Sequence, residues 1–113
     1  MKRPDGAGRL DKLVTFQKRS AASDGHGGEE STWSDQFTVW GGFTHLRGGE
    51  TVLAERLEGV HPAVIRVRRS TDTVKVTTDW RVKDADDVIY AIRDVTPTER
   101  SHIDFLVASG TAQ

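Results

Sequence analysis

Short segments in which apolar and polar residues alternate fill the second half of the chain. The segments are 60–69, 80–83, 88–93 and 103–108. In the first of them, Ile65 and Val67 lie on either side of Arg66. A period of two puts alternate side chains on opposite faces of a β-strand, and turn residues at 84–87 and 96–99 separate the segments. The pattern predicts a mainly β fold, a small antiparallel β-barrel or sandwich.

The first half of the chain predicts two further strands around a polar stretch. Residues 12–18 are rich in apolar and β-branched side chains and predict the first strand. Residues 20–32 contain no large apolar side chain, so a solvated loop is expected there. Alternating Phe and Val side chains then predict a strand over 37–46, with Trp33 packing at its entrance.

Residues 47–59 are the one segment for which a helix is expected. Gly48 and Gly59 bracket it, and glycine suits the left-handed position that follows the last helical turn. Leu53 and Leu57 are four residues apart and share a helical face. Only about nine residues are available, too few for a helix that is stable without packing. The segment is therefore either a short helix docked across one end of the barrel through the two leucines, or mobile until assembly orders it.

The length of 113 residues indicates one domain, because typical domains contain about 100–150 residues. We expect a flexible N-terminal arm over 1–9, a single β-barrel domain over 10–109 that contains the inserted segment 47–59, and a flexible C-terminal tail over 110–113. No apolar stretch approaches the roughly 18 residues that a membrane span requires, so no membrane partner is expected.

No candidate catalytic or metal site emerges from the sequence. Because the chain has no cysteine, it has no thiolate nucleophile, disulfide or cysteine-based zinc site. The four histidines lack metal-ligand spacing, and the acidic turn 84–87 lacks the glycine and glutamate of a calcium loop. We expect binding and assembly, without enzymatic activity or cofactor. A small hydrolase, the enzymatic alternative, would need an activity that survives removal of all partners.

A net charge of −1 argues against general DNA binding, which requires a surplus of basic side chains. The strand aromatics Trp80, Tyr90 and Phe105 alternate onto apolar faces and are interpreted as core residues rather than a base-stacking surface. A small oligonucleotide-binding barrel is the alternative hypothesis, and it predicts salt-dependent binding of single strands. Its basic face would consist of Arg66, Arg68, Arg69, Lys75, Arg81 and Lys83, which are interpreted instead as solvent-facing strand positions.

A series of motifs in a fixed order extends from residue 10 to residue 108. The motifs are Thr15-Phe16-Gln17, Trp33, Phe37, Val39-Trp40, Gly49-Glu50 with Ala54, Ile65-Arg66-Val67-Arg68, Arg81-Val82, Tyr90-x-Ile92 and Val95. In order and spacing they resemble the head–tail joining family of long-tailed bacteriophages, the head-closure, stopper or connector proteins. The chain differs at 86–89, where the family often has a glycine, and in its longer connection over 70–78.

The resemblance implies a structural virion protein without a reaction or cofactor. Its expected partners are copies of itself in a ring, sixfold or a multiple, the portal or adaptor protein of the head, and the tail terminator or tail tube. Packaged double-stranded DNA would pass through the ring without sequence-specific binding. The ring would close the DNA channel after packaging and offer a tail docking surface. We therefore expect synthesis in a host cytoplasm and a final place in the neck of a phage, prophage or gene transfer particle.

Two sets of residues are singled out as sites. The expected assembly and channel segment contains Arg47, Gly48, Gly49, Glu50, Leu53, Glu55, Arg56 and Leu57. The expected anchors of the fold are Phe16, Trp33, Phe37, Trp40, Trp80, Tyr90, Ile92 and Phe105. Among these anchors, Trp33 and Trp40 are expected to pack with Phe16 or Phe37 beneath the polar loop.

Overall fold

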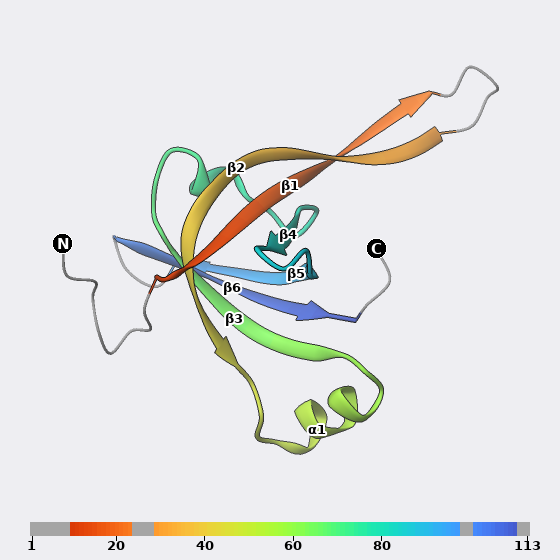
Figure 1. The fold of residues 1–113 in the computed structure, drawn as a ribbon, viewed down its shortest axis with the longest axis vertical. Helices are drawn as coiled ribbons and strands as arrows, with labels where there is room; N and C mark the ends of the chain where they lie inside the picture. Colours follow the sequence, from red (N-terminus) through yellow and green to blue (C-terminus); the bar gives the residue numbers. More distant parts are fainter. Residues whose placement is uncertain (1–9, 24–28, 98–100, 111–113) are drawn as a thin grey trace.

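The strands predicted from alternating apolar and polar residues form a closed β-barrel (Figure 1). The computed structural model describes residues 10–23, 29–97 and 101–110, and within them six strands and one α-helix form. The strands are β1 (Lys12–Ser23), β2 (Glu29–His45), β3 (His61–Arg68), β4 (Arg81–Asp84), β5 (Ile89–Pro97) and β6 (His102–Ser109). Helix α1 (Glu50–Leu57) connects β2 to β3, and a 3₁₀ turn, η1 (Thr73–Lys75), lies between β3 and β4. The predicted mainly β fold with one short helix is confirmed.

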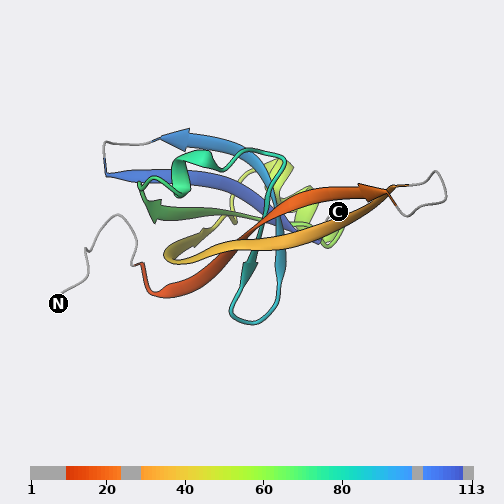
Figure 2. The ribbon, with the colours of Figure 1, turned by 90° about the horizontal axis from the view of Figure 1, so that it is seen from above.

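The strands follow one another around the barrel in the order β1-β2-β3-β6-β5-β4, and every neighbouring pair is antiparallel. Strand direction therefore alternates around the barrel. The β2–β3 connection with α1 and the β4–β5 turn lie at one end, here called the helix end. The β1–β2 pair leaves the barrel at the other end, here called the hairpin end, and extends well beyond the remaining strands (Figure 2).

Side chains of alternate residues from all six strands fill the barrel. In the centre, the ring of Phe16 lies 5.1 Å from the rings of both Phe37 and Phe105. The buried cluster also contains Val14, Ala63, Ile65, Val67, Val76, Trp80, Val82, Tyr90, Ile92, Ile103 and Val107. Burial of this apolar surface is the main stabilising contribution to the fold.

The connection between β3 and β4 covers the core at the hairpin end. Thr73 is buried, and its hydroxyl donates to the Arg68 carbonyl oxygen at 2.9 Å and accepts the Ser70 N–H at 2.8 Å. These bonds satisfy a buried hydroxyl and fix the turn. Val76 and Trp80 from the same connection join the core cluster. The long connection over 70–78 therefore covers the core at the hairpin end of the barrel.

Much of the segment expected to be a loop, residues 20–32, is strand. Backbone pairing between β1 and β2 continues from Arg19 opposite Trp33 to Ser23 opposite Glu29. Antiparallel strands can pair through their backbones without apolar side chains, so the prediction of a loop is wrong for residues 20–23 and 29–32. Trp33 consequently lies within β2 rather than at its entrance. Residues 24–28, the rest of that expected loop, lie outside the described residues, as do the expected arm 1–9 and residues 111–113. Of the second predicted turn, 96–99, residues 98 and 99 also lie outside, and residues 96 and 97 belong to β5.

Two β-bulges change the direction of the strands. Phe16 pairs with Phe37 but Gln17 pairs with Asp35, so Gln36 is an extra residue in β2. On β5, Ile92 and Asp94 pair with consecutive residues of β6, which leaves Arg93 as the extra residue. A bulge bends the strand and redirects side chains. The first marks where the hairpin extension leaves the barrel, and the second positions Arg93 at the helix end.

The expected burial of Trp40 is wrong. Its side chain lies on the outside of the barrel and is 49% exposed, opposite Leu13, which is also exposed. The physical reason is the pleat: Val39 and Gly41 face the core, so the residue between them must face outward. Gly41 permits close packing there, because a Cβ at this position would lie 3.1 Å from Ile65 Cγ2. The alternation of apolar and polar residues that predicts this strand also predicts that Trp40 faces outward.

The different environments of Phe105 and Trp40 predict different costs of truncation. Phe105→Ala removes a fully buried ring and should lower the free energy of unfolding by about 3–5 kcal/mol. Trp40→Ala removes a half-exposed ring and should cost less than about 1 kcal/mol, as surface substitutions usually do. Urea denaturation followed by circular dichroism measures both. Equal losses in the two variants would contradict this assignment of the core.

Candidate functional site

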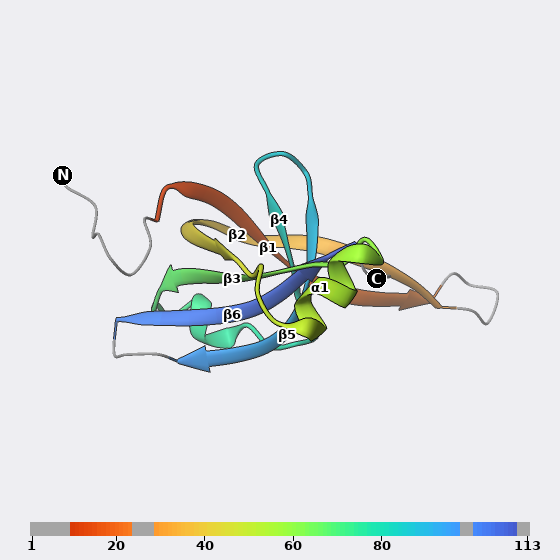
Figure 3. The same ribbon diagram turned by 90° about the horizontal axis from the view of Figure 1, so that it is seen from below.

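Helix α1 stands beyond the barrel at the helix end rather than on a face of the sheet (Figures 1 and 3). Gly49 precedes it with φ of 90°, and Gly59 follows it with φ of 87°. Such left-handed positions favour glycine, which explains why glycines bracket the helix. No residue of α1 is buried. The helix is therefore stabilised by its own backbone hydrogen bonds and by contacts along one side.

Leu53 and Leu57 face away from the barrel, being 51% and 88% exposed. Of the two alternatives for this segment, a helix docked on the barrel through these leucines is therefore not what the structure contains. The short connections on either side set the orientation of the helix, and they turn its polar side toward the strands. An exposed pair of leucines on an isolated helix is an apolar surface that a neighbouring molecule can cover.

A charged pair holds α1 to the barrel. The Arg93 guanidinium donates to the Glu55 carboxylate in bidentate fashion, from Nη1 to Oε1 at 3.2 Å and from Nη2 to Oε2 at 2.5 Å. These bonds hold the pKa of the Glu55 carboxyl below its usual value and raise the pKa of Arg93. The Val60 N–H also donates to the Glu55 carbonyl oxygen at 2.8 Å. Sequence reasoning missed Arg93, because only the register of β5 against β6 shows that it is the bulged residue.

A cavity of about 290 Å³ lies between α1 and the barrel rim. We call it the basic pocket, and it is lined by His45, Leu46, Arg47, Arg56, His61 and Pro62. Its walls come from the end of β2, the start of β3 and one residue of α1. Two arginines and two histidines are among its lining residues, and none of these residues is acidic. Sequence analysis named Arg47 and Arg56 but not the histidines, whose spacing along the chain gives no sign of their proximity.

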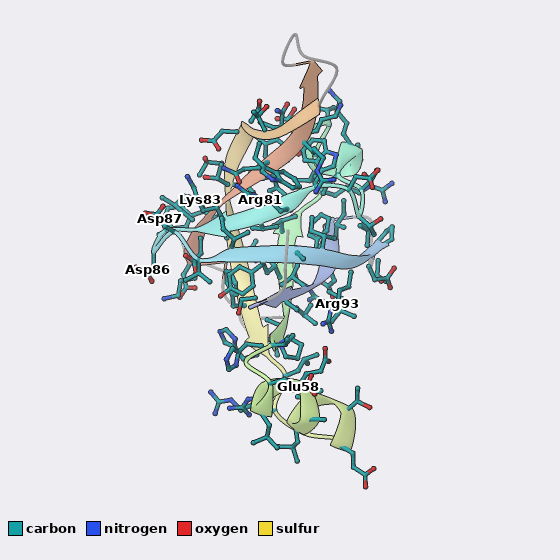
Figure 4. All side chains as sticks on the ribbon, turned by 90° about the vertical axis from the view of Figure 1, so that its right-hand side faces the viewer. Glu58, Arg81, Lys83, Asp86, Asp87 and Arg93 are labelled. Atoms are coloured by element: carbon teal, nitrogen blue, oxygen red, sulfur yellow. The ribbon has the colours of Figure 1, made fainter. Side chains whose placement is uncertain are left out.

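The β4–β5 turn carries the acidic group of the helix end, as Figure 4 shows for Asp86 and Asp87. The predicted turn at 84–87 is confirmed, since the Asp84 carboxylate accepts the N–H groups of Asp86 and Val88, both at 2.9 Å. Asp87 takes φ of 64°. Tyr90 lies beside the turn, and burial, followed by the Asp84 carboxylate, raises the pKa of its hydroxyl.

A polar network fixes the base of the hairpin extension. Arg81 Nε donates to Gln17 Oε1 and Gln17 Nε2 donates to Asp35 Oδ1, both at 2.6 Å. The Trp33 ring lies beside two cations, with Arg81 Cζ 4.4 Å and Arg19 Cζ 5.0 Å from its centre. Burial, reinforced by Arg19, lowers the pKa of Arg81. Trp33 therefore packs in this network and not, as expected, against Phe16 or Phe37.

The structure separates the expected sites into distinct regions. Arg47, Gly48, Gly49, Glu50, Leu53, Arg56 and Leu57 are exposed at the helix end, and Glu55 contacts Arg93. Of the expected anchors, the core contains Phe16, Trp80, Tyr90, Ile92 and Phe105, with Phe37 packed against it. Trp33 and Trp40 lie outside that cluster.

Three of the six basic side chains considered for a nucleic-acid-binding face contact other side chains of the barrel. Arg66 pairs with Asp104 at 2.7 Å, Arg81 belongs to the Trp33 network, and Lys83 lies 4.0 Å from Asp87. The aromatics Trp80, Tyr90 and Phe105, which a base-stacking surface would need, are in the core. Within the described parts of the chain, no group of three or more His, Asp or Glu residues could hold a metal ion. No helix in those parts is long and apolar enough to cross a membrane.

Known structures share this fold. A protein of the virion of a native gene transfer agent particle is 22% identical, with a TM-score of 0.64, over 97% of this chain and 100% of that one. A protein from Shigella flexneri 2a, with a solution structure, is 20% identical, with a TM-score of 0.68, over 94% of this chain and 97% of that one. No curated protein sequence matches the chain.

Family membership comes from a sequence model rather than from these structures. The model described as phage head completion protein matches residues 6–110, nearly the whole chain. The match includes the barrel, the helix end and the hairpin extension. Proteins of this family are structural parts of a virion and not enzymes. By this match, the chain belongs to the phage head completion protein family.

Proposed function

We propose that this protein forms a ring in the virion neck that joins the head to the tail. In this proposal the ring binds beneath the portal or adaptor protein, closes the DNA channel after packaging, and docks the tail terminator or tail tube. Similarity to a gene transfer agent virion protein supports a place in such a particle. A net charge of −1 suits a conduit through which DNA passes without being tightly bound.

The exposed apolar side of α1 is the observation on which the proposal chiefly depends. Leu53 and Leu57 project from a helix with no buried side chain, and the bidentate contact of Glu55 with Arg93 is its charged attachment to the barrel. An eight-residue helix with so little packing is only marginally stable. We infer that residues 47–59 are mobile in the free protein and become ordered against neighbours and the channel in the ring.

The first test follows assembly. We expect the purified protein to be monomeric or weakly associated in analytical ultracentrifugation, because a pair of exposed leucines is too small to drive obligate association. We expect it to form rings when added to purified DNA-filled heads that lack it, as seen by electron microscopy. Stable large rings at low micromolar concentration without heads would contradict templated assembly. Failure to bind heads would contradict the proposed function itself.

A second test removes the apolar side of α1. The double variant Leu53→Ser and Leu57→Ser should keep the thermal stability of the parent, because both side chains are exposed, but should bind heads poorly or leave them leaking DNA. Val74→Ser is the control, since Val74 is also half exposed but lies on the β3–β4 connection. DNA retention after nuclease treatment measures the outcome. Normal retention by the double leucine variant would contradict a role for this surface.

The pKa of Glu55 predicts how pH affects the free protein. A carboxyl whose pKa is lower in the folded state stabilises the contact above its ordinary value of 4.5, and the contact is lost as the pH falls through the lowered value. We expect the amides of residues 52–57 to be less protected than those of the barrel, and their remaining protection to fall below pH 4.5 before that of the barrel does. Glu55→Gln should lose this protection at every pH. Hydrogen exchange measures both, and protection of α1 equal to that of the barrel would contradict its mobility.

A further inference from the structure

The basic pocket has the chemistry of an anion site that the chain does not satisfy internally. Among the described residues, no carboxylate forms an ion pair with Arg47 or Arg56. Glu55, the residue before Arg56 on α1, is already bound by Arg93. Two arginines lining one cavity favour an acidic ligand, since arginine forks match carboxylate and phosphate oxygens.

The acidic turn of β4 and β5 offers a matching group with a fixed shape. The Asp84 carboxylate is used inside the turn, where it accepts two backbone N–H groups. Asp86 and Asp87 are exposed at its tip (Figure 4). A turn held by its own hydrogen bonds loses little conformational entropy when it docks, so it is preorganised for binding.

The topology places the pocket and the turn on opposite sides of the same barrel end. The pocket lies where β2 leads to β3, and the turn joins β4 to β5. In the order β1-β2-β3-β6-β5-β4 these two connections are half a circuit apart. One chain therefore cannot bring its own turn into its own pocket. A row of identical chains, however, can place each turn beside the pocket of the next.

We propose that the Asp86–Asp87 turn of one copy docks in the basic pocket of the next copy. The proposal rests on the ring of the proposed function and names the contact that propagates it. A head-to-tail contact between two different patches is the kind that closes a cyclic ring of identical subunits. Because the pocket contains Arg56 of α1 together with residues of the barrel rim, a docked turn also bridges the helix to the barrel. Ring formation would thereby order α1.

Charge reversal tests the contact. One variant carries Arg47→Glu and Arg56→Glu, and a second carries Asp86→Lys and Asp87→Lys. Each alone should reduce the fraction of heads that carry a ring by about tenfold or more, because like charges across an interface strongly disfavour pairing. All four changes in one chain should restore the rings. An equimolar mixture of the two reversed proteins should also assemble, since alternating copies restore each contact in an even-numbered ring.

Matched controls carry the same charge changes at the hairpin end. Arg68→Glu with Arg69→Glu, and Asp72→Lys with Asp79→Lys, alter exposed residues away from the pocket and the turn. Both controls should form rings normally, and thermal melting should show that every variant is folded. If they fail as the reversed variants do, net charge rather than the contact is responsible and the proposal is wrong.

The outcomes separate this contact from its alternatives. If the pocket variant fails but the turn variant assembles normally, the pocket holds another anion, such as a DNA phosphate, and the proposal is wrong. If both reversed proteins form rings as the parent does, the contact is wrong while the proposed function stands. If the parent itself does not bind heads, the proposed function fails before the contact is tested. Restoration by the fourfold variant is the result that supports the docking.

Discussion

Closure of the sheet between β1 and β4 is the constraint on which the other features depend. The two strands pair over only four positions, from Val14 opposite Asp84 to Gln17 opposite Arg81. The Arg81–Gln17–Asp35 hydrogen bonds lie at the end of this short ladder, where the hairpin extension begins. Closure removes the exposed edges that an open six-stranded sheet would present. It also fixes which connections face each other around the barrel.

The two bulges adapt the closed barrel to its attachments. The extra residue Gln36 lets β2 leave the barrel in partnership with β1, and the extra residue Arg93 reaches the helix end. Arg93 then binds Glu55, so one irregularity in β5 determines how α1 is held. A regular ladder would give neither feature, because each bulge changes the local bend and the direction of side chains. The bulge in β5 therefore occurs next to a surface proposed to act in assembly, and the bulge in β2 occurs where the hairpin extension begins.

At the helix end, basic and acidic side chains are concentrated in two separate places. The basic pocket and the acidic turn are built from different connections, and between them Glu55 and Arg93 neutralise each other. A nearly neutral chain can thus present strong local charge on two sides while its net charge stays at −1. Such separation suits the proposed ring, in which each copy would recognise the next and DNA would pass. In that proposal, specificity comes from complementary patches rather than from a large apolar interface.

The sequence by itself determined the class of fold and the place of its one helix. Period-two alternation in residues 60–69, 88–93 and 103–108 leads to strands because one face must be buried, and the glycines around α1 mark its limits. The same alternation places Trp40 on the outer face, contrary to the expectation that it packs in the core. Only the tertiary structure decided that Arg93 reaches Glu55 and that His45 and His61 share a pocket with two arginines. The reason is that a local pattern fixes which face a residue occupies, whereas its neighbours across the barrel depend on register, bulges and closure, which involve residues distant in the chain.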